Sequence, residues 1–241
     1  MTSMTLQQMR DQVRSVVDID ATDISDTVLD NMIGQGFDTI VYSEKRWPFF
    51  ETTTTFNTVG GTKTYSLDTI AGSPDAITQG IREIMSLRND DHVLEFIGND
   101  NADFIYPLNV TTSGQPWEWS FWNDTVTLYP TPDGAATIYA RVTRYPTDFG
   151  VGTAAGSSPD LPAPFHPVLV TYATAKAYLQ QEDPVMAQQY FIQFQTDLDN
   201  IGRRYNDTPA PQPMVANSRI ATRYAVGTGG LRYASTGGVI W

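Results

Sequence analysis

The chain has 241 residues, 41% of them hydrophobic and 12% aromatic, so it can bury a substantial core in one large domain or two smaller ones. Its formal charge of −12 argues against an extended nucleic-acid-binding surface, because such surfaces bind phosphates with lysine and arginine. The absence of cysteine excludes disulfides, thiolate metal sites and cysteine nucleophiles. No apolar run approaches the roughly 20 residues of a membrane-spanning helix, and the polar N-terminus does not read as a signal sequence, so we expect a soluble, cytoplasmically made protein.

A first helix is predicted close to the N-terminus. Thr5 and Gln8 have the spacing of a capping box, in which each side chain bonds the other residue's backbone N–H. Apolar residues then recur at three- and four-residue steps as far as Asp18, which places them on one face of a helix.

A second helix is predicted to open at Ser25 and Asp26 and to end before Trp47-Pro48, because the residue before a proline avoids helical geometry. Two glycines, Gly34 and Gly36, interrupt its apolar face. A glycine inside a helix either weakens it or lets another backbone approach closely.

From position 49 to 148 the sequence is rich in β-branched and aromatic residues, broken by Gly, Pro, Asn and Asp, which is typical of short antiparallel strands. Segments 125–128 and 138–142 alternate so that every second side chain falls on one face, as a half-buried sheet requires. We expect seven or eight strands, the clearest at 51–58, 63–67, 81–87, 92–97, 116–121, 125–129 and 137–145. The region predicts a small sandwich or barrel.

A loop rich in Gly, Ala, Ser and Pro follows at 150–164 and is expected to be flexible. A helical hairpin comes next. Its first helix begins near Phe165 and has a largely buried surface made of Val168, Leu169, Tyr172, Ala175, Ala177 and Leu179. Its second helix starts at Asp183-Pro184, because a short acid accepts hydrogen bonds from the first turn and proline suits the next position. The stripe that faces the first helix consists of Ala187, Tyr190, Phe191, Phe194, Leu198 and Ile201.

The predicted fold class is α+β. Two separate pairs of amphipathic helices would each leave an apolar stripe in water, so the pairs at 1–48 and 165–206 are expected to form one four-helix bundle. The β-sandwich or barrel-like region at 49–148 would then be an antiparallel insertion, with a loop at 149–164. Residues 207–241 would form an extended C-terminal arm.

The arm has a composition of its own. All 27 acidic residues lie at or before Asp207, whereas three arginines follow it. Disordered segments are poor in aromatic and bulky aliphatic residues, and this one contains several, so we expect it to become ordered on a partner. The residues expected to make that contact are Arg219, Arg223, Tyr224, Arg232, Tyr233, Ile240 and Trp241.

The sequence offers little catalytic chemistry. Its two histidines, His92 in a predicted strand and His166 at a helix start, have no second strong ligand at suitable spacing, so neither a metal site nor a catalytic triad is predicted. The acidic segment 99–103 lacks the glycine and glutamate of a calcium loop and is interpreted as a surface turn. Segment 60–64 resembles part of a phosphate-binding loop, but a strand follows it, so a hairpin turn explains it better.

A tryptophan cluster leaves one alternative open. Trp117, Trp119 and Trp122 could form a platform for a sugar, with Glu118 and Asp124 as acid and base, which would make the protein carbohydrate-binding or carbohydrate-degrading. Trp117 and Trp119 are two residues apart and would share one sheet face, which equally suits a core or an oligomer contact. Aromatic residues at structural spacing usually pack, which favours the second interpretation.

The order of these segments, with TLYPTPD at 127–133, YARVTRY at 139–145, Leu161-Pro162 and Glu182-Asp183 at the hairpin turn, resembles the head-to-tail connector adaptors of tailed bacteriophages. The likeness is strongest over 125–205. It implies a structural virion protein at the head-tail junction, assembled in the host cytoplasm, with no enzymatic activity, metal or cofactor.

The resemblance also implies partners. Twelve subunits would form a ring beneath the portal, and the arm at 208–241 would dock on the portal. A downstream tail, stopper or nozzle protein would bind elsewhere, with the β region facing the tail side or the periphery. DNA would pass through the channel without specific binding, which suits an acidic body because it does not grip phosphates. A stopper or tail completion protein remains a further alternative.

Overall fold

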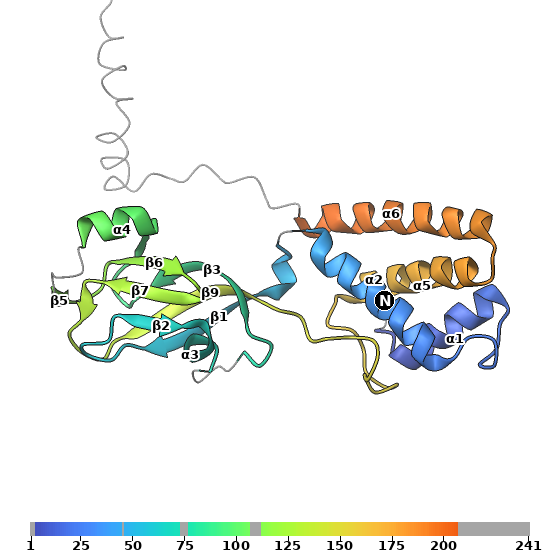
Figure 1. Cartoon of the computed structure of the whole chain (residues 1–241), viewed down its shortest axis with the longest axis horizontal. Coiled ribbons are helices and arrows are strands. Elements are labelled where there is room, and N and C mark those ends of the chain that lie inside the picture. The colour runs from blue at the N-terminus through green and yellow to red at the C-terminus, as the bar shows by residue number, and fades with distance from the viewer. Residues whose placement is uncertain (1–2, 45, 73–76, 107–111, 207–241) are drawn as a thin grey trace, which may run out of the picture. The chain divides into compact units, whose positions relative to one another are not determined.

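The computed structural model describes residues 3–44, 46–72, 77–106 and 112–206, and it confirms the α+β class. Four of the six described α-helices lie together (Figure 1), and we call them the helical part: α1 (Leu6–Val17), α2 (Asp26–Ser43), α5 (His166–Gln180) and α6 (Pro184–Asn206). The strands gather with the other two helices, and we call the segment from Glu51 to Arg144 the β part.

Helix α5 is the centre of the helical part. It is buried on most sides, through Val168, Leu169, Val170, Ala173, Ala175 and Ala177. Helices α1 and α2 both pack against it, and Tyr172 meets Phe191 and Phe194 of α6 with ring centroids 5.7 and 5.0 Å away. A helix that is apolar all round belongs in a core. The predicted buried surface is confirmed except at Leu179, which lies near the end of α5 and is 47% exposed.

Side-chain capping bonds are present at two of the predicted helix starts, those of α1 and α6, whereas Ser25 makes none at the start of α2. The Thr5 hydroxyl accepts from the Gln8 N–H at 3.3 Å, and the Gln8 side chain accepts from the Thr5 N–H at 2.9 Å, so the capping box is complete. At the start of α6 the Met186 N–H donates to a carboxylate oxygen of Asp183 at 3.1 Å. Both starts were readable because a cap is a local feature of the sequence.

The loop after the β part packs on the start of α1. The Leu6 N–H donates to the Ser157 carbonyl and the Gln7 N–H to the Ala155 carbonyl, both at 2.9 Å. These N–H groups have no partner inside the helix, so the loop satisfies them. Composition predicted a flexible loop here, and the structure instead holds it with backbone hydrogen bonds.

The close backbone approach that Gly34 allowed is confirmed. A Cβ atom on Gly34 of α2 would lie 3.0 Å from the Phe149 carbonyl oxygen. On the other side of this contact Gly150 has φ +129°, and a Cβ there would lie 3.0 Å from both the Asp30 oxygen and the Gly34 Cα. Glycine suits both positions, because a Cβ at either one would crowd the other backbone.

A buried ion pair joins α1 to α2. The Arg10 guanidinium makes two bonds to the Asp30 carboxylate, at 2.7 and 2.6 Å, and a third to Asp26 at 3.1 Å. Both Arg10 and Asp30 are buried. Hydrogen bonding to Asp30 raises the pKa of Arg10, so the guanidinium stays charged. This pair was not predicted from the sequence.

The β part contains nine described strands: β1 (Glu51–Asn57), β2 (Thr64–Ser66), β3 (Ile81–Arg88), β4 (Glu95–Phe96), β5 (Ser113–Gly114), β6 (Glu118–Trp122), β7 (Thr125–Tyr129), β8 (Thr131–Pro132) and β9 (Thr137–Arg144). They form sheets of order β1-β9-β3, β2-β7-β6-β4 and β5-β8. Pairing is antiparallel except for the short β4–β6 and β5–β8 contacts, which are parallel. Each predicted strand segment overlaps an observed strand, although 92–97 shrinks to the two residues of β4 and His92 lies outside it.

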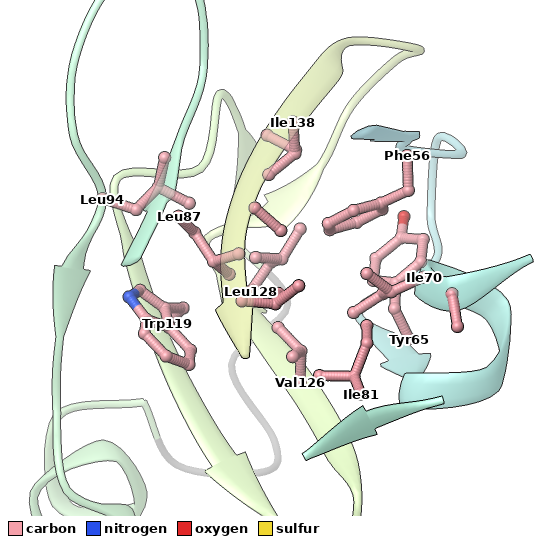
Figure 2. Packing of buried hydrophobic residues seen from close by; sticks show 13 residues of the cluster. Phe56, Tyr65, Ile70, Ile81, Leu87, Leu94, Trp119, Val126, Leu128 and Ile138 are labelled. Atoms are coloured by element: carbon pink, nitrogen blue, oxygen red, sulfur yellow. The ribbon is translucent and has the colours of Figure 1, made fainter. Parts of the chain in front are cut away.

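One apolar cluster fills the β part and draws side chains from both larger sheets (Figure 2). The three-stranded sheet contributes Phe56, Ile81, Leu87, Ile138, Ala140 and Val142. The four-stranded sheet contributes Tyr65, Trp119, Val126 and Leu128. The alternation predicted for 125–128 and 138–142 is confirmed, because the apolar members of both segments point into this cluster.

Two predictions for the β part are wrong. Segment 60–64 does not close a hairpin, because β1 pairs with β9 and β2 pairs with β7 in the other sheet. Segment 99–103 is not a simple turn but most of helix α4 (Asn99–Ile105). A further short helix, α3 (Leu67–Ala71), starts where the Ser66 hydroxyl accepts a hydrogen bond from the Thr69 N–H. Neither helix is long enough to show a helical period in the sequence.

Two single-turn 3₁₀ helices, η1 (Pro48–Phe50) and η2 (Ala163–Phe165), flank the β part along the chain. The ring of Trp47 lies 5.4 Å from that of Phe165, and its indole N–H donates to the Ile40 carbonyl at 3.0 Å. The end of β9 is fixed by Arg144, whose guanidinium bonds the Asp160 carboxylate at 3.0 Å. This bond lowers the pKa of Asp160, so the carboxylate stays ionised.

Candidate interaction surfaces

The predicted arm residues, from Arg219 to Trp241, lie outside the described residues. Their role as a contact surface therefore stays a prediction. Among the described residues, the β part offers further surfaces.

The three clustered tryptophans do not form one platform. Trp119 is 4% exposed and points into the core beside Leu94 (Figure 2). Trp122 follows three residues later in β6, so it lies on the opposite face of the sheet, where it is 73% exposed. Trp117 precedes β6 and is 48% exposed. Of the two tryptophans predicted to share a sheet face, Trp119 is therefore in the core, whereas Trp117 is about half exposed.

A groove lies on the outer face of the four-stranded sheet, beside helix α4. Its volume is about 480 Å³. Strand residues of β2, β6 and β7 and side chains of α4 line it: Thr64, Ser120, Trp122, Thr127 and Tyr129 from the strands, Asn99, Asp100, Asp103 and Tyr106 from α4 and its end, and Lys63 before β2. Helix α4 is held to β6 because the Asn99 side-chain amide donates to the Phe121 carbonyl at 2.9 Å.

One end of this groove is built from stacked rings. Tyr106 stacks on Tyr129 with centroids 4.6 Å apart and planes 21° apart, and the Lys63 ammonium lies 4.4 Å from the Tyr129 centroid. The Tyr106 hydroxyl donates to Glu118 at 2.7 Å, and burial together with this bond raises the pKa of Tyr106 to about 12. Glu118 is itself buried, so it is engaged in structure and is not placed as the free acid that the glycosidase interpretation requires.

Glu118 and Asp124 are also kept apart. Glu118 begins β6, and Asp124 lies in the turn after its end, where its φ of +54° belongs to the tight connection to β7. A strand rises about 3.3 Å per residue, so the two carboxylates lie at opposite ends of β6, well beyond the spacing of a glycosidase pair. The structure therefore does not bring these two carboxylates together.

The two histidines have structural surroundings. His166 is buried, its Nδ1 accepts from the Met4 N–H at 2.9 Å, and its Nε2 lies 3.0 Å from the Leu161 carbonyl. One ring nitrogen therefore accepts and the other donates, which is the neutral form. The His92 backbone N–H donates to the Asn89 side chain at 2.8 Å in a turn. Within the described residues, no group of three or more His, Asp or Glu could hold a metal ion.

Six of the exposed large apolar side chains belong to segment 93–122, which includes β4, α4 and β6: Val93, Phe96, Phe104, Ile105, Trp117 and Trp122. Large exposed apolar side chains that gather in one region mark contacts with other molecules. None of the helices among residues 3–206, where described, has the length and apolar character to cross a membrane.

Among these features, the exposed aromatic side chains are the ones that indicate contact with other macromolecules. Comparison with protein families identifies the class as a structural adaptor of bacteriophage particles. The chain belongs to the SU10 adaptor protein family, a phage head-tail adaptor family whose profile matches residues 4–217. The resemblance inferred from the sequence is thereby confirmed. No curated protein matches the chain.

Membership of this family makes the protein a component of the virion that contacts other virion proteins. The sequence signals for it were the hairpin turn at Glu182-Asp183 and the motifs in 125–145. Segments 60–64 and 99–103 and Trp122 each stood out in the sequence, but their meeting in one groove was not predicted, because they are distant from one another in the chain.

Proposed function

We propose that this protein is a head-to-tail connector adaptor, which forms a ring between the portal and the tail and lines the DNA exit channel. The observation that carries the proposal is the family match over residues 4–217. The protein would act at the head-tail junction of the virion, after assembly in the host cytoplasm, and as a purely structural component it would need no cofactor.

The charge of the chain suits a channel through which DNA slides. The net charge is −12, and four arginines of the described residues already pair with carboxylates: Arg10, Arg14, Arg46 and Arg144. Paired arginines contribute little to phosphate binding, because a guanidinium that already bonds a carboxylate is not free to neutralise a DNA phosphate and release its counterion. A ring of twelve such subunits would have an acidic lumen, which repels the duplex.

The finer architecture belongs to the same proposal. We infer that α1, α2, α5 and α6 form a four-helix bundle contributed by 1–48 and 165–206, and that residues 49–148 form an inserted β-sandwich domain. Three helices packed against α5 and a single apolar cluster shared by two sheets support this division. The bundle would be the body of the ring, and the β domain would contact the next tail, stopper or nozzle protein.

The C-terminal arm, residues 207–241, would dock on the portal. Its arginines would pair with portal acids, and Tyr224, Tyr233, Ile240 and Trp241 would be buried on contact. An arm that becomes ordered only when bound lets the subunit remain soluble before assembly and wrap a large surface afterwards.

The test is a binding assay between portal rings of the source phage and this protein, full-length and truncated after Asp207, with electron microscopy of the complexes. We expect a ring on the portal with the full-length chain only. Truncated protein that binds as well as the full-length chain would refute the role of the arm. Binding of the full-length chain to assembled tails but not to portals would favour a stopper or tail completion protein instead.

A further inference from the structure

The groove beside α4 has a composition that the connector role does not explain. Its floor carries three short hydroxyl side chains, Thr64, Ser120 and Thr127, of which Ser120 is buried and already bonds the Tyr129 hydroxyl at 3.5 Å. These belong to the outer face of the four-stranded sheet, opposite the apolar cluster, because their neighbours Tyr65, Trp119, Val126 and Leu128 are the ones that point inward. The groove is thus a hydroxyl-lined surface and not an extension of the core.

Trp122 supplies an aromatic face at this groove. It lines the groove and is 73% exposed, although a tryptophan side chain normally buries most of its large surface. Trp119, in the same strand, belongs to the apolar cluster, whereas Trp122 does not. An exposed indole at the edge of a polar groove provides a flat apolar surface that a ligand can cover.

Charged side chains at the rim complete a set of donors and acceptors. The Lys63 ammonium, held over Tyr129 at 4.4 Å, can only donate hydrogen bonds, whereas the carboxylates of Asp100 and Asp103 can only accept them. Threonine and serine hydroxyls can do both. Such a mixture matches a ligand whose own hydroxyl groups donate and accept in equal measure.

We propose that this groove binds a pyranose oligosaccharide, with the C–H face of one sugar ring on Trp122 and its hydroxyl groups bonded to the floor and rim. The volume of about 480 Å³ lies within the range of small-ligand sites. A single-stranded nucleic acid could also stack on an indole, but Asp100 and Asp103 would repel its phosphates. An apolar peptide would leave the hydroxyl and carboxylate groups without partners.

The proposal does not depend on the connector role. A glycan site on the β part could serve an adaptor or any other virion protein, and its failure would leave the portal experiment unaffected. It also differs from a glycosidase, since Glu118 is bonded to Tyr106 and Asp124 lies at the far end of β6. The groove binds and does not cleave.

The experiment is calorimetric titration of the full-length protein with oligosaccharides of two to six sugars. One arm uses fragments of bacterial surface polysaccharides and the other uses peptidoglycan glycan fragments, and lysine-rich and aromatic peptides form a third arm. We expect binding in a glycan arm. Binding in neither glycan arm, or in the peptide arm alone, overturns the proposal.

Two variants then locate the site. Trp122→Ala should weaken glycan binding at least about tenfold, which corresponds to roughly 1.4 kcal/mol. The matched control is Trp117→Ala, which removes another exposed tryptophan that does not line the groove. Thr127→Val, which removes one floor hydroxyl at nearly constant shape, should also weaken binding. Circular dichroism should show all three folded. Unchanged binding in Trp122→Ala, or an equal loss in Trp117→Ala, contradicts the assignment.

Discussion

The helical part and the β part are held together by different kinds of contact. In the helical part, charge lies inside, where Arg10 bonds Asp30, and small residues such as Gly34 allow the backbones to meet. In the β part the interior is an unbroken apolar cluster, and large aromatic side chains such as Phe104 and Trp122 are exposed to solvent.

The two parts therefore have different tasks: the helical part keeps a fixed shape, and the β part presents a surface. A buried ion pair and close glycine contacts tolerate only one arrangement of the helices, because any shift leaves a charge unpaired or creates a clash. An apolar cluster stabilises a sheet whichever residues its outer face carries. The helical part is therefore suited to hold a fixed geometry, and the outer faces of the β part are free to specialise in contacts. Substitutions in each part test whether the two parts differ in this way.

The largest effect is expected for Trp119→Ala in the β part, because it would remove a large side chain from the apolar cluster. Truncations of this kind lower the free energy of unfolding by about 3–5 kcal/mol. Trp122→Ala on the opposite face should change it by no more than about 0.5 kcal/mol. Urea denaturation followed by circular dichroism measures both. Equal losses would mean that Trp122 also supports the fold.

Arg10→Ala should be nearly as damaging in the helical part, because it leaves the buried Asp30 carboxylate without its partner. We expect a loss of about 3 kcal/mol in the free energy of unfolding. The control is Arg46→Ala, which breaks an exposed pair with Glu51 and should cost about 1 kcal/mol or less. A small effect of Arg10→Ala would show that the helical part is held by apolar packing alone.

Gly150→Ala tests the close contact between α2 and the loop that follows the β part. The new Cβ would lie 3.0 Å from two backbone atoms at a φ of +129°, so we expect a loss of about 2 kcal/mol in the free energy of unfolding. Gly152→Ala is a matched control, with φ +85° but open space around its Cβ, and should cost about 1 kcal/mol. Equal costs would show that strain and not contact determines the effect.

The smallest expected effect is the pH dependence of the stability that the Arg144–Asp160 pair contributes. Arg144 holds the pKa of Asp160 below its ordinary value of 3.8, so this pair stabilises the folded state above about pH 4 and the contribution is lost as pH falls through the lowered pKa. Asp160→Asn should cost about 1 kcal/mol at neutral pH. The difference from the unaltered protein should shrink in urea titrations at successively lower pH. A difference that stays constant down to pH 2 would exclude this linkage.

The sequence predicted features that depend on near neighbours. The capping box at Thr5 and Gln8 and the cap at Asp183 were found because both are defined within three residues. The pairing of β1 with β9 was not predicted, since the residues that pair are far apart in the chain and a turn motif at 60–64 pointed to a local hairpin. A short helix such as α4 has too few turns to show a period.

The site was less predictable than the fold. Trp122 stood out in the sequence, but which of the three tryptophans is exposed depends on where β6 begins. One local feature of the sequence does indicate the ion pair between Arg10 and Asp30. Arg10 lies four residues after Leu6 and three before Val13, so it falls on the apolar stripe of α1, where a charge requires a buried partner.

The strands that carry the chain into and out of the β part are neighbours, since Glu51 at the start of β1 is paired with Thr143 near the end of β9. The two ends of this long excursion are therefore held together as closely as the ends of a hairpin. Lengthening a closed loop costs entropy only logarithmically. Strands can thus be added to or removed from the far end of the excursion over evolutionary time, while α2 and α5 keep their positions.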